Sequence, residues 1–110
     1  MKLFDSNKKA SILLFNAPTR DEAKRVRRTL LEEKLIRGGF IIPVDAGYLA
    51  NDGEIIEDHE YFVVFAHTLS TLTKEALETI EQISISFGMS WDVKDGTDAY
   101  AKWVFGLGSL

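Results

Sequence analysis

The order of the patterned segments constrains this chain most, because strand, helix, long hairpin, helix and strand follow one another within 110 residues. A continuous apolar run, Ser11–Phe15, is typical of a buried strand. It is followed by a helix that opens after Pro18, two long strands joined at Asn51–Gly53, a second helix and a short strand around Trp91. A β-α-β-β-α-β order in so short a chain predicts an α+β, ferredoxin-like sandwich, in which two helices back one sheet.

Capping residues mark the predicted helices. Thr19 can cap the first helix, and the side chain of Glu22 can bond back to the cap. Gly38 and Gly39 are predicted to end this helix. The second helix is the cleanest amphipathic segment, with apolar residues at spacings of three and four: Leu69, Leu72, Ala76, Ile80, Ile83 and Phe87. Gly88 is predicted to stop it, before a last strand over residues 89–93 and a closing helix over 97–105.

The two strands of the hairpin are predicted over about Phe40–Ala50 and Glu54–His67, which exceeds the usual strand of about 5–6 residues. Gly53 supplies the positive φ that the tight turn needs. Pro43 has no N–H to donate and indicates an edge strand or a bulge. A hairpin of this length overhangs a layer of two helices. Its far part, Val44–Asp58, therefore needs another surface to pack on.

Composition predicts one soluble domain over residues 10–110, preceded by a flexible leader over residues 1–9. The net charge of −4 disfavours a nucleic-acid partner, and the chain has no cysteine for a thiolate metal site or a nucleophile. No apolar run approaches the length of a membrane span, so no membrane partner and a cytoplasmic location are expected. No catalytic motif is present, and we expect a protein that is not an enzyme.

The acidic run in the hairpin is the best candidate for a metal site, formed by Glu57, Asp58, His59 and Glu60. Strand alternation puts Glu57 and His59 on one face and the other two on the opposite face. Imidazole and carboxylate suit Cu(II) or Zn, but two ligands do not make a specific site. A solvated polar strand face explains the same residues, and no cofactor is required.

Two further sets of side chains are candidates for a site between subunits. Four aromatic residues can line a cleft there or pack in a core or an interface: Tyr48, Trp91, Tyr100 and Trp103. The first helix is strongly basic, and Arg25 or Arg28 can hold an anion. A solvated helix face, or contact with the acidic hairpin of another subunit, explains the basic residues equally.

Several segments together resemble the CutA family over about Ser11 to Val104. They are Ala17–Ala23, Leu30–Leu35, Ile41–Pro43, Gly53–Glu57 and Gly96–Trp103. The resemblance implies a ferredoxin-like fold, a tight homotrimer in which the long hairpin grips a neighbouring subunit, and a role in divalent-cation tolerance. Copper binding is associated with the family, and its trimer is similar to that of PII signalling proteins.

The chain departs from the family's pattern at residues tied to metal or cleft chemistry. Where the family usually has Ala-Ala-Cys-Val-Asn, this chain has Ile36–Phe40, with glycine at the cysteine position. The family's Tyr-x-Trp falls on Leu49 and Asn51. The sequence therefore predicts a CutA-like homotrimer that acts as a non-enzymatic binding or scaffold protein. The alternative is a PII-like trimeric sensor that holds a small anionic ligand or nucleotide between subunits.

Overall fold

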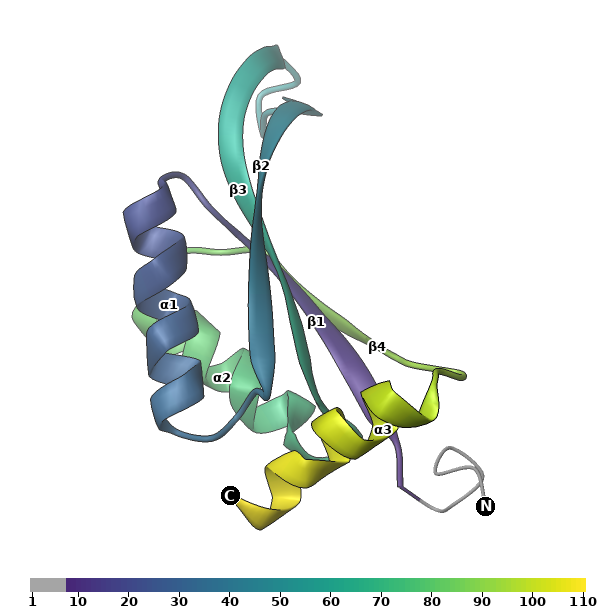
Figure 1. Cartoon of the computed structure of the whole chain (residues 1–110). Coiled ribbons are helices and arrows are strands. Elements are labelled where there is room, and N and C mark those ends of the chain that lie inside the picture. Colours follow the sequence, from purple (N-terminus) through teal and green to yellow (C-terminus); the bar gives the residue numbers. More distant parts are fainter. Residues whose placement is uncertain (1–7) are drawn as a thin grey trace.

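The computed structural model describes residues 8–110 and confirms the predicted α+β order (Figure 1). Residues 1–7 of the predicted leader lie outside the described residues. One antiparallel sheet has the strand order β2-β3-β1-β4. The elements are β1 (Ala10–Ala17), α1 (Arg20–Glu32), β2 (Gly38–Leu49), β3 (Ile55–Leu69), a 3-10 turn (Ser70–Leu72), α2 (Thr73–Ile83), β4 (Gly88–Asp92), α3 (Asp98–Phe105) and a 3-10 turn (Gly106–Ser109).

The main core lies between one face of the sheet and the helices α1 and α2. Ile41, Val64 and Phe15 are neighbours across β2, β3 and β1, so their side chains share this face. Val64 and Phe15 are fully buried. The helices contribute apolar stripes to this core: Ala23, Val26 and Leu30 from α1, and from α2 Ala76 and Ile80, which belong to the predicted stripe. The central place of β3 and the edge place of β2, which Pro43 indicates, are both confirmed.

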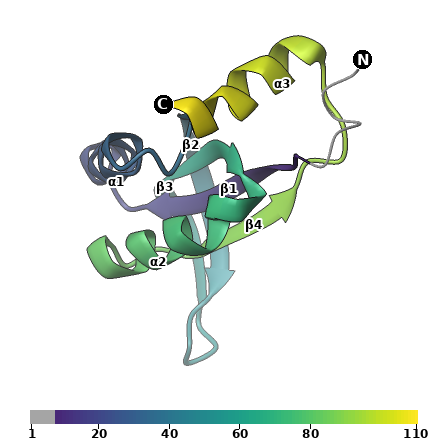
Figure 2. The same cartoon turned by 90° about the horizontal axis from the view of Figure 1, so that it is seen from below.

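The opposite face of the sheet, which we call the open face, is covered only at its base, by α3. A second cluster there joins Ala10 of β1 to Ala101, Val104 and Phe105 of α3. Figure 2 shows α3 apart from α1 and α2, and Figure 1 shows it at the end of the molecule opposite to the hairpin tip. The structure therefore has two helices on one face and one short helix across the base of the other.

The hairpin extends past the rest of the fold, as its length predicts. The pairing of β1 with β3 ends at Ala17 and Phe62, whereas β2 and β3 stay paired out to Leu49 and Ile55. The chain is accordingly elongated, with extents of 52 × 25 × 21 Å. Leu49 and Ile55 near the tip are about two-thirds exposed. Within residues 8–110, the overhang thus lacks a partner surface in its own protomer.

The first helix ends differently from the prediction. It stops at Glu32, before the predicted end at Gly38 and Gly39. Lys34 takes the left-handed conformation (φ 57°) that is typical of a glycine at a helix end. The N–H groups of Lys34 and Leu35 donate to the carbonyls of Leu31 and Leu30, which satisfies the last turn. Gly38 and Gly39 instead begin β2. The prediction placed the helix end at the nearest glycines. It failed because Lys34, which is not a glycine, adopts the left-handed conformation that ends the helix.

The start of α1 and both ends of α2 need smaller corrections. Thr19 caps α1 as predicted, but the carboxylate of Glu22 pairs with Arg25 instead of bonding back to the cap. The α2 helix begins only at Thr73, since Leu69 still belongs to β3. Phe87 lies outside the helix, and Gly88 opens β4.

Candidate functional site

The predicted metal residues lie on the overhanging part of the hairpin, at a β-bulge. Ala46 pairs with His59 and Tyr48 pairs with Ile56, so Glu57 and Asp58 together face the single residue Gly47. Asp58 has a positive φ of 55° at this point. The bulge interrupts simple alternation and places His59 on the face of Ile56. The prediction that Glu57 and His59 share a face is therefore wrong.

The ring of His59 belongs to an aromatic cluster on the hairpin. It stacks on Tyr61 at 4.5 Å between centroids and lies 6.1 Å from Tyr48. Burial, and next the neighbouring Tyr61, raise the pKa of the Tyr48 hydroxyl. Within residues 8–110, no group of three or more His, Cys, Asp or Glu side chains gathers as a metal site.

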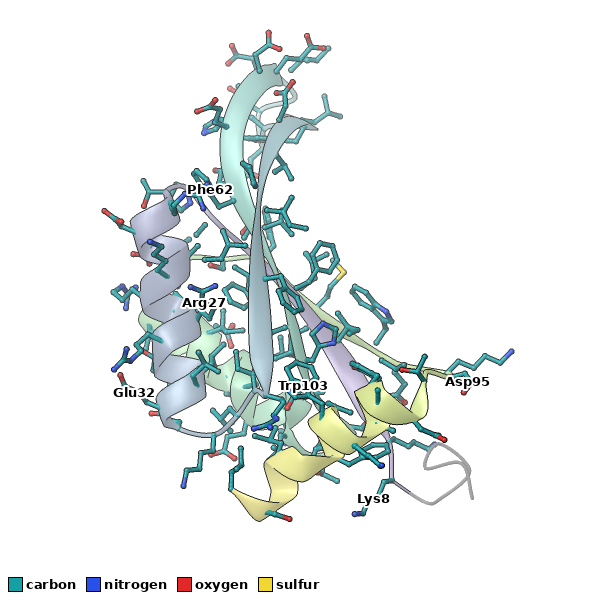
Figure 3. The ribbon with its side chains drawn as sticks, viewed as in Figure 1. Lys8, Arg27, Glu32, Phe62, Asp95 and Trp103 are labelled. Carbon is teal, nitrogen blue, oxygen red and sulfur yellow. The ribbon has the colours of Figure 1, made fainter. Side chains whose placement is uncertain are left out.

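The remaining predicted aromatic residues divide between two places. The ring centroids of Tyr100 and Trp103 in α3 are 6.1 Å apart, at the base of the open face. Trp103 lies there against the start of β2 (Figure 3). Trp91 lies on the edge strand β4 and is 45% exposed. Tyr48 belongs to the hairpin cluster. The four residues therefore do not line one cleft within a protomer.

Gly38 has a role that sequence reasoning missed. A Cβ atom at this position would lie 2.8 Å from the ring of Trp103. The indole therefore rests directly on the strand backbone, where only glycine leaves room. Arg37, one residue earlier, holds the same helix, because its Nε donates to the Trp103 carbonyl at 2.9 Å. A glycine in a sequence usually indicates a turn or a helix end, where its conformational freedom is needed. A glycine that is required only for close packing against a distant side chain leaves no pattern in the neighbouring sequence.

The open face above α3 carries a continuous row of apolar side chains. Phe40, Phe65, Leu14 and Met89 are successive cross-strand neighbours from β2 to β4. Phe40 is 58% exposed and Met89 is 53% exposed. Ile42, two residues after Phe40 on the same face of β2, is 43% exposed. The hairpin cluster continues this face, because alternate residues of a strand point to one side. A large apolar sheet face of this kind is typical of a protein–protein interface.

The two arginines proposed for an anion lie on α1, away from the open face. Arg25 is paired with Glu22 and also donates to the carbonyl of Ile83. Arg28 is paired with Glu32. Both guanidinium groups are thus already bonded to a carboxylate of their own helix.

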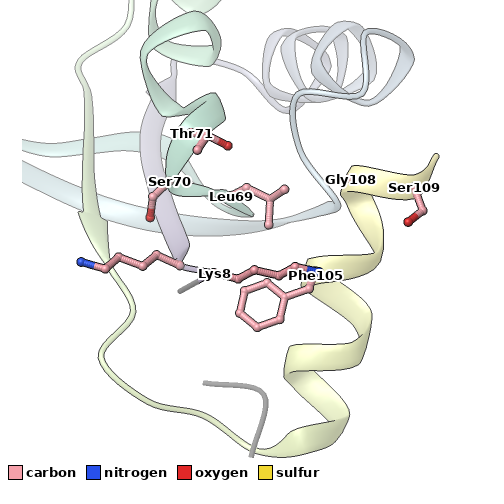
Figure 4. A pocket seen from close by; sticks show the side chains of 8 residues that line it. Lys8, Leu69, Ser70, Thr71, Phe105, Gly108 and Ser109 are labelled. Carbon is pink, nitrogen blue, oxygen red and sulfur yellow. The ribbon is translucent and has the colours of Figure 1, made fainter. Parts of the chain in front are cut away.

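A cavity of about 560 Å³ lies at the base of the molecule (Figure 4). Its walls come from the segment before β1, the end of β3 and the C-terminal turn, and they include Lys8, Ser70 and Phe105. None of the candidate site residues predicted from sequence lines this cavity. Behind Ser70, a carboxylate oxygen of Asp92 accepts hydrogen bonds from Ser11 and Ser70 at 2.8 Å. These bonds tie β4 to β1 and to the end of β3.

No helix in the described part of the chain is long and apolar enough to cross a membrane.

Comparisons with known proteins agree on one family. The model of the CutA1 divalent ion tolerance protein matches residues 11–106. The crystal structure of CutA1 from Ehrlichia chaffeensis is similar to this chain with a TM-score of 0.84 and 27% identity, over 96% of this chain and 100% of that one. CutA1 from Pyrococcus horikoshii has a TM-score of 0.80 and 26% identity, over 88% and 96% of the two chains.

A third structure shows the same fold at lower identity. It is the periplasmic divalent cation tolerance protein CutA from Archaeoglobus fulgidus, with a TM-score of 0.82 and 20% identity, over 89% of this chain and 97% of that one. No protein in the search of curated sequences matches this chain.

Proposed function

This chain belongs to the CutA1 divalent ion tolerance protein family, and we propose that it acts as a homotrimer in the response to divalent cations. In this role it is a binding or scaffold protein of the cytoplasm and not an enzyme. The observation that carries the proposal is the open apolar face, which runs from Phe40 and Met89 out to the hairpin cluster.

The physical argument for self-association rests on water-exposed apolar area. Phe40, Ile42, Met89 and Trp91 are each about half exposed, and burying such area stabilises an assembly by about 25 cal/mol per Å². The overhanging hairpin has apolar residues at its tip and no partner within the protomer. In a closed ring of three copies, one surface of each protomer meets a different surface of the next, so the hairpin of one copy can cover the open face of its neighbour.

We expect the protein in solution to have about three times the 12.4 kDa mass of one chain. Sedimentation equilibrium at micromolar concentration measures this mass directly. A stable particle of one chain would contradict the proposed trimer.

For the cation, we propose that His59 is the central ligand and that Glu57, Asp58 or Glu60 supplies carboxylate oxygens. Imidazole nitrogen and carboxylate oxygen together suit Cu(II) and Zn. Because residues 8–110 of one protomer do not gather three such groups, the site would be completed where hairpins of neighbouring copies meet. His59 lies on the same side of the hairpin as the open face, which favours this arrangement.

Calorimetric titration with Cu(II) and with Zn(II) tests the site. We expect binding by the wild type and a loss of affinity of about tenfold or more, at least about 1.4 kcal/mol, in His59→Ala. The matched control is His67→Gln, which removes the only other histidine of the chain and leaves the residues of the bulge at Glu57 and Asp58 in place. Equal affinity in wild type and His59→Ala would exclude His59 as a ligand.

No observation favours the sensor alternative to the same degree. Arg25 and Arg28, the residues proposed to hold its anion, each already bond a carboxylate of α1.

A further inference from the structure

One cluster of rings fastens α3 to the base of the open face, and His67 is at its centre. The imidazole of His67, on β3, lies 5.4–5.5 Å from the rings of Phe40, Tyr100 and Trp103, in edge-to-face arrangements. Its Nδ1 atom is 2.9 Å from the hydroxyl of Tyr100. Two of these three rings come from α3, so the histidine is the point where helix and sheet meet.

The side chains that contact His67 in the described part of the chain are uncharged. The groups facing it are Tyr100 and Trp103 from α3, Phe40 and Gly38 from β2, and Ile12 from β1. The guanidinium of Arg37 lies 5.8 Å from the Trp103 ring, on which His67 also packs. Within the described residues, neither of the ion pairs involves His67.

We propose that His67 is a pH-sensitive latch for α3, which holds the helix on the sheet when its ring is neutral and releases it when the ring is protonated. A neutral imidazole suits this site because it packs among rings and shares one hydrogen bond with Tyr100. An imidazolium there loses hydration and gains no carboxylate partner. Attraction to the faces of the rings offsets part of this cost.

The direction of the titration agrees with this geometry. Burial lowers the pKa of His67 from its ordinary value of 6.5. A histidine with a lowered pKa in the folded state contributes stability that is present above pH 6.5 and is lost as the pH falls through the folded-state pKa. Docking of α3 therefore weakens under mildly acidic conditions.

The latch also has a consequence for the trimer, and that part rests on the proposed function. Phe40 contacts His67 and lies on the face that we propose as the interface between copies. Release of α3 would disturb this ring and the base of the interface. We therefore expect the trimer to be weaker at acidic pH than at neutral pH.

The composition of the chain allows a direct test, since it has only two histidines and two tryptophans. In the full-length His59→Asn variant, His67 is the only imidazole, and NMR measures its titration midpoint. We expect a midpoint below 6.5. A midpoint at or above 6.5 would overturn the latch.

A second readout follows the helix itself. In Trp91→Phe, Trp103 is the only tryptophan, and we expect its emission to shift reversibly to the red between about pH 8 and about pH 5. His67→Gln in the same background should abolish this shift. Trp103 emission that stays constant while His67 titrates, or a shift that survives in His67→Gln, would contradict the proposal.

A further variant keeps the test decisive where His67→Gln fails to fold. Tyr100→Phe removes the hydroxyl but keeps the ring, so the pH response of Trp103 should persist, because burial of the imidazole causes it. Loss of the response in Tyr100→Phe would refute this cause. The mass of the wild-type protein at the same pH values separates the two proposals: a wild type that is monomeric at every pH, together with a Trp103 response in Trp91→Phe, retains the latch and excludes the trimer.

Discussion

Replacing Phe40 with lysine is expected to convert the assembly into protomers of 12.4 kDa. Phe40 is more than half exposed in one protomer and begins the apolar row across the open face. Each protomer would then present an unpaired ammonium group where two copies meet, and burying such a charge costs several kcal/mol. The same charge is tolerated in the free protomer, where water reaches it. Sedimentation and light scattering at equal protein concentration measure the change.

Two matched variants make this result specific. Leu31→Lys introduces the same charge at a partly exposed leucine of α1, on the covered side of the sheet, where a cation suits the C-terminal turn of the helix. It should leave the mass unchanged. Ile42→Lys tests the open face without touching His67 and should behave like Phe40→Lys. A trimer that persists in both open-face variants would exclude this face as the interface.

The largest loss of stability is expected for Phe15→Ala. Phe15 is fully buried at the centre of the main core, and its strand neighbours are Val64 and Gly88. Truncating a buried phenylalanine leaves a cavity and costs about 3–5 kcal/mol, which is a large part of the usual 5–15 kcal/mol of a domain. Urea denaturation monitored by circular dichroism measures the free energy of unfolding.

The measurement should use the Phe40→Lys background, so that assembly does not contribute to the stability. The control there is Phe87→Ala, which truncates a phenylalanine that is 80% exposed. We expect the control to change the free energy of unfolding by no more than about 0.5 kcal/mol. Equal losses in the two variants would mean that the core assignment of Phe15 is wrong.

Features that depend on near neighbours in the chain were predicted from sequence. Thr19 caps the first helix because its hydroxyl can reach an N–H three residues on. Gly53 turns the hairpin with a φ of 85°. Apolar residues at helical spacing identify the buried stripes of α1 and α2. The family resemblance was confirmed by the family model over residues 11–106.

Features that depend on a distant strand or helix were not predicted. The bulge at Glu57 and Asp58 arises from the register of two strands and moves His59 to another face. Gly38 is needed for the indole of Trp103, which lies 65 residues later in the sequence. The cluster around His67 joins residues from β2, β3 and α3.

The amino-acid sequence by itself thus determined the order of the elements, the Thr19 cap and the length of the hairpin, because these follow from periodicity and from interactions within a few residues. Only the tertiary structure decided which side chains share a face, since one inserted residue in a strand reverses alternation beyond it. It also decided that the apolar row from Phe40 to Met89 stays exposed, because the single short helix α3 covers only the base of that face.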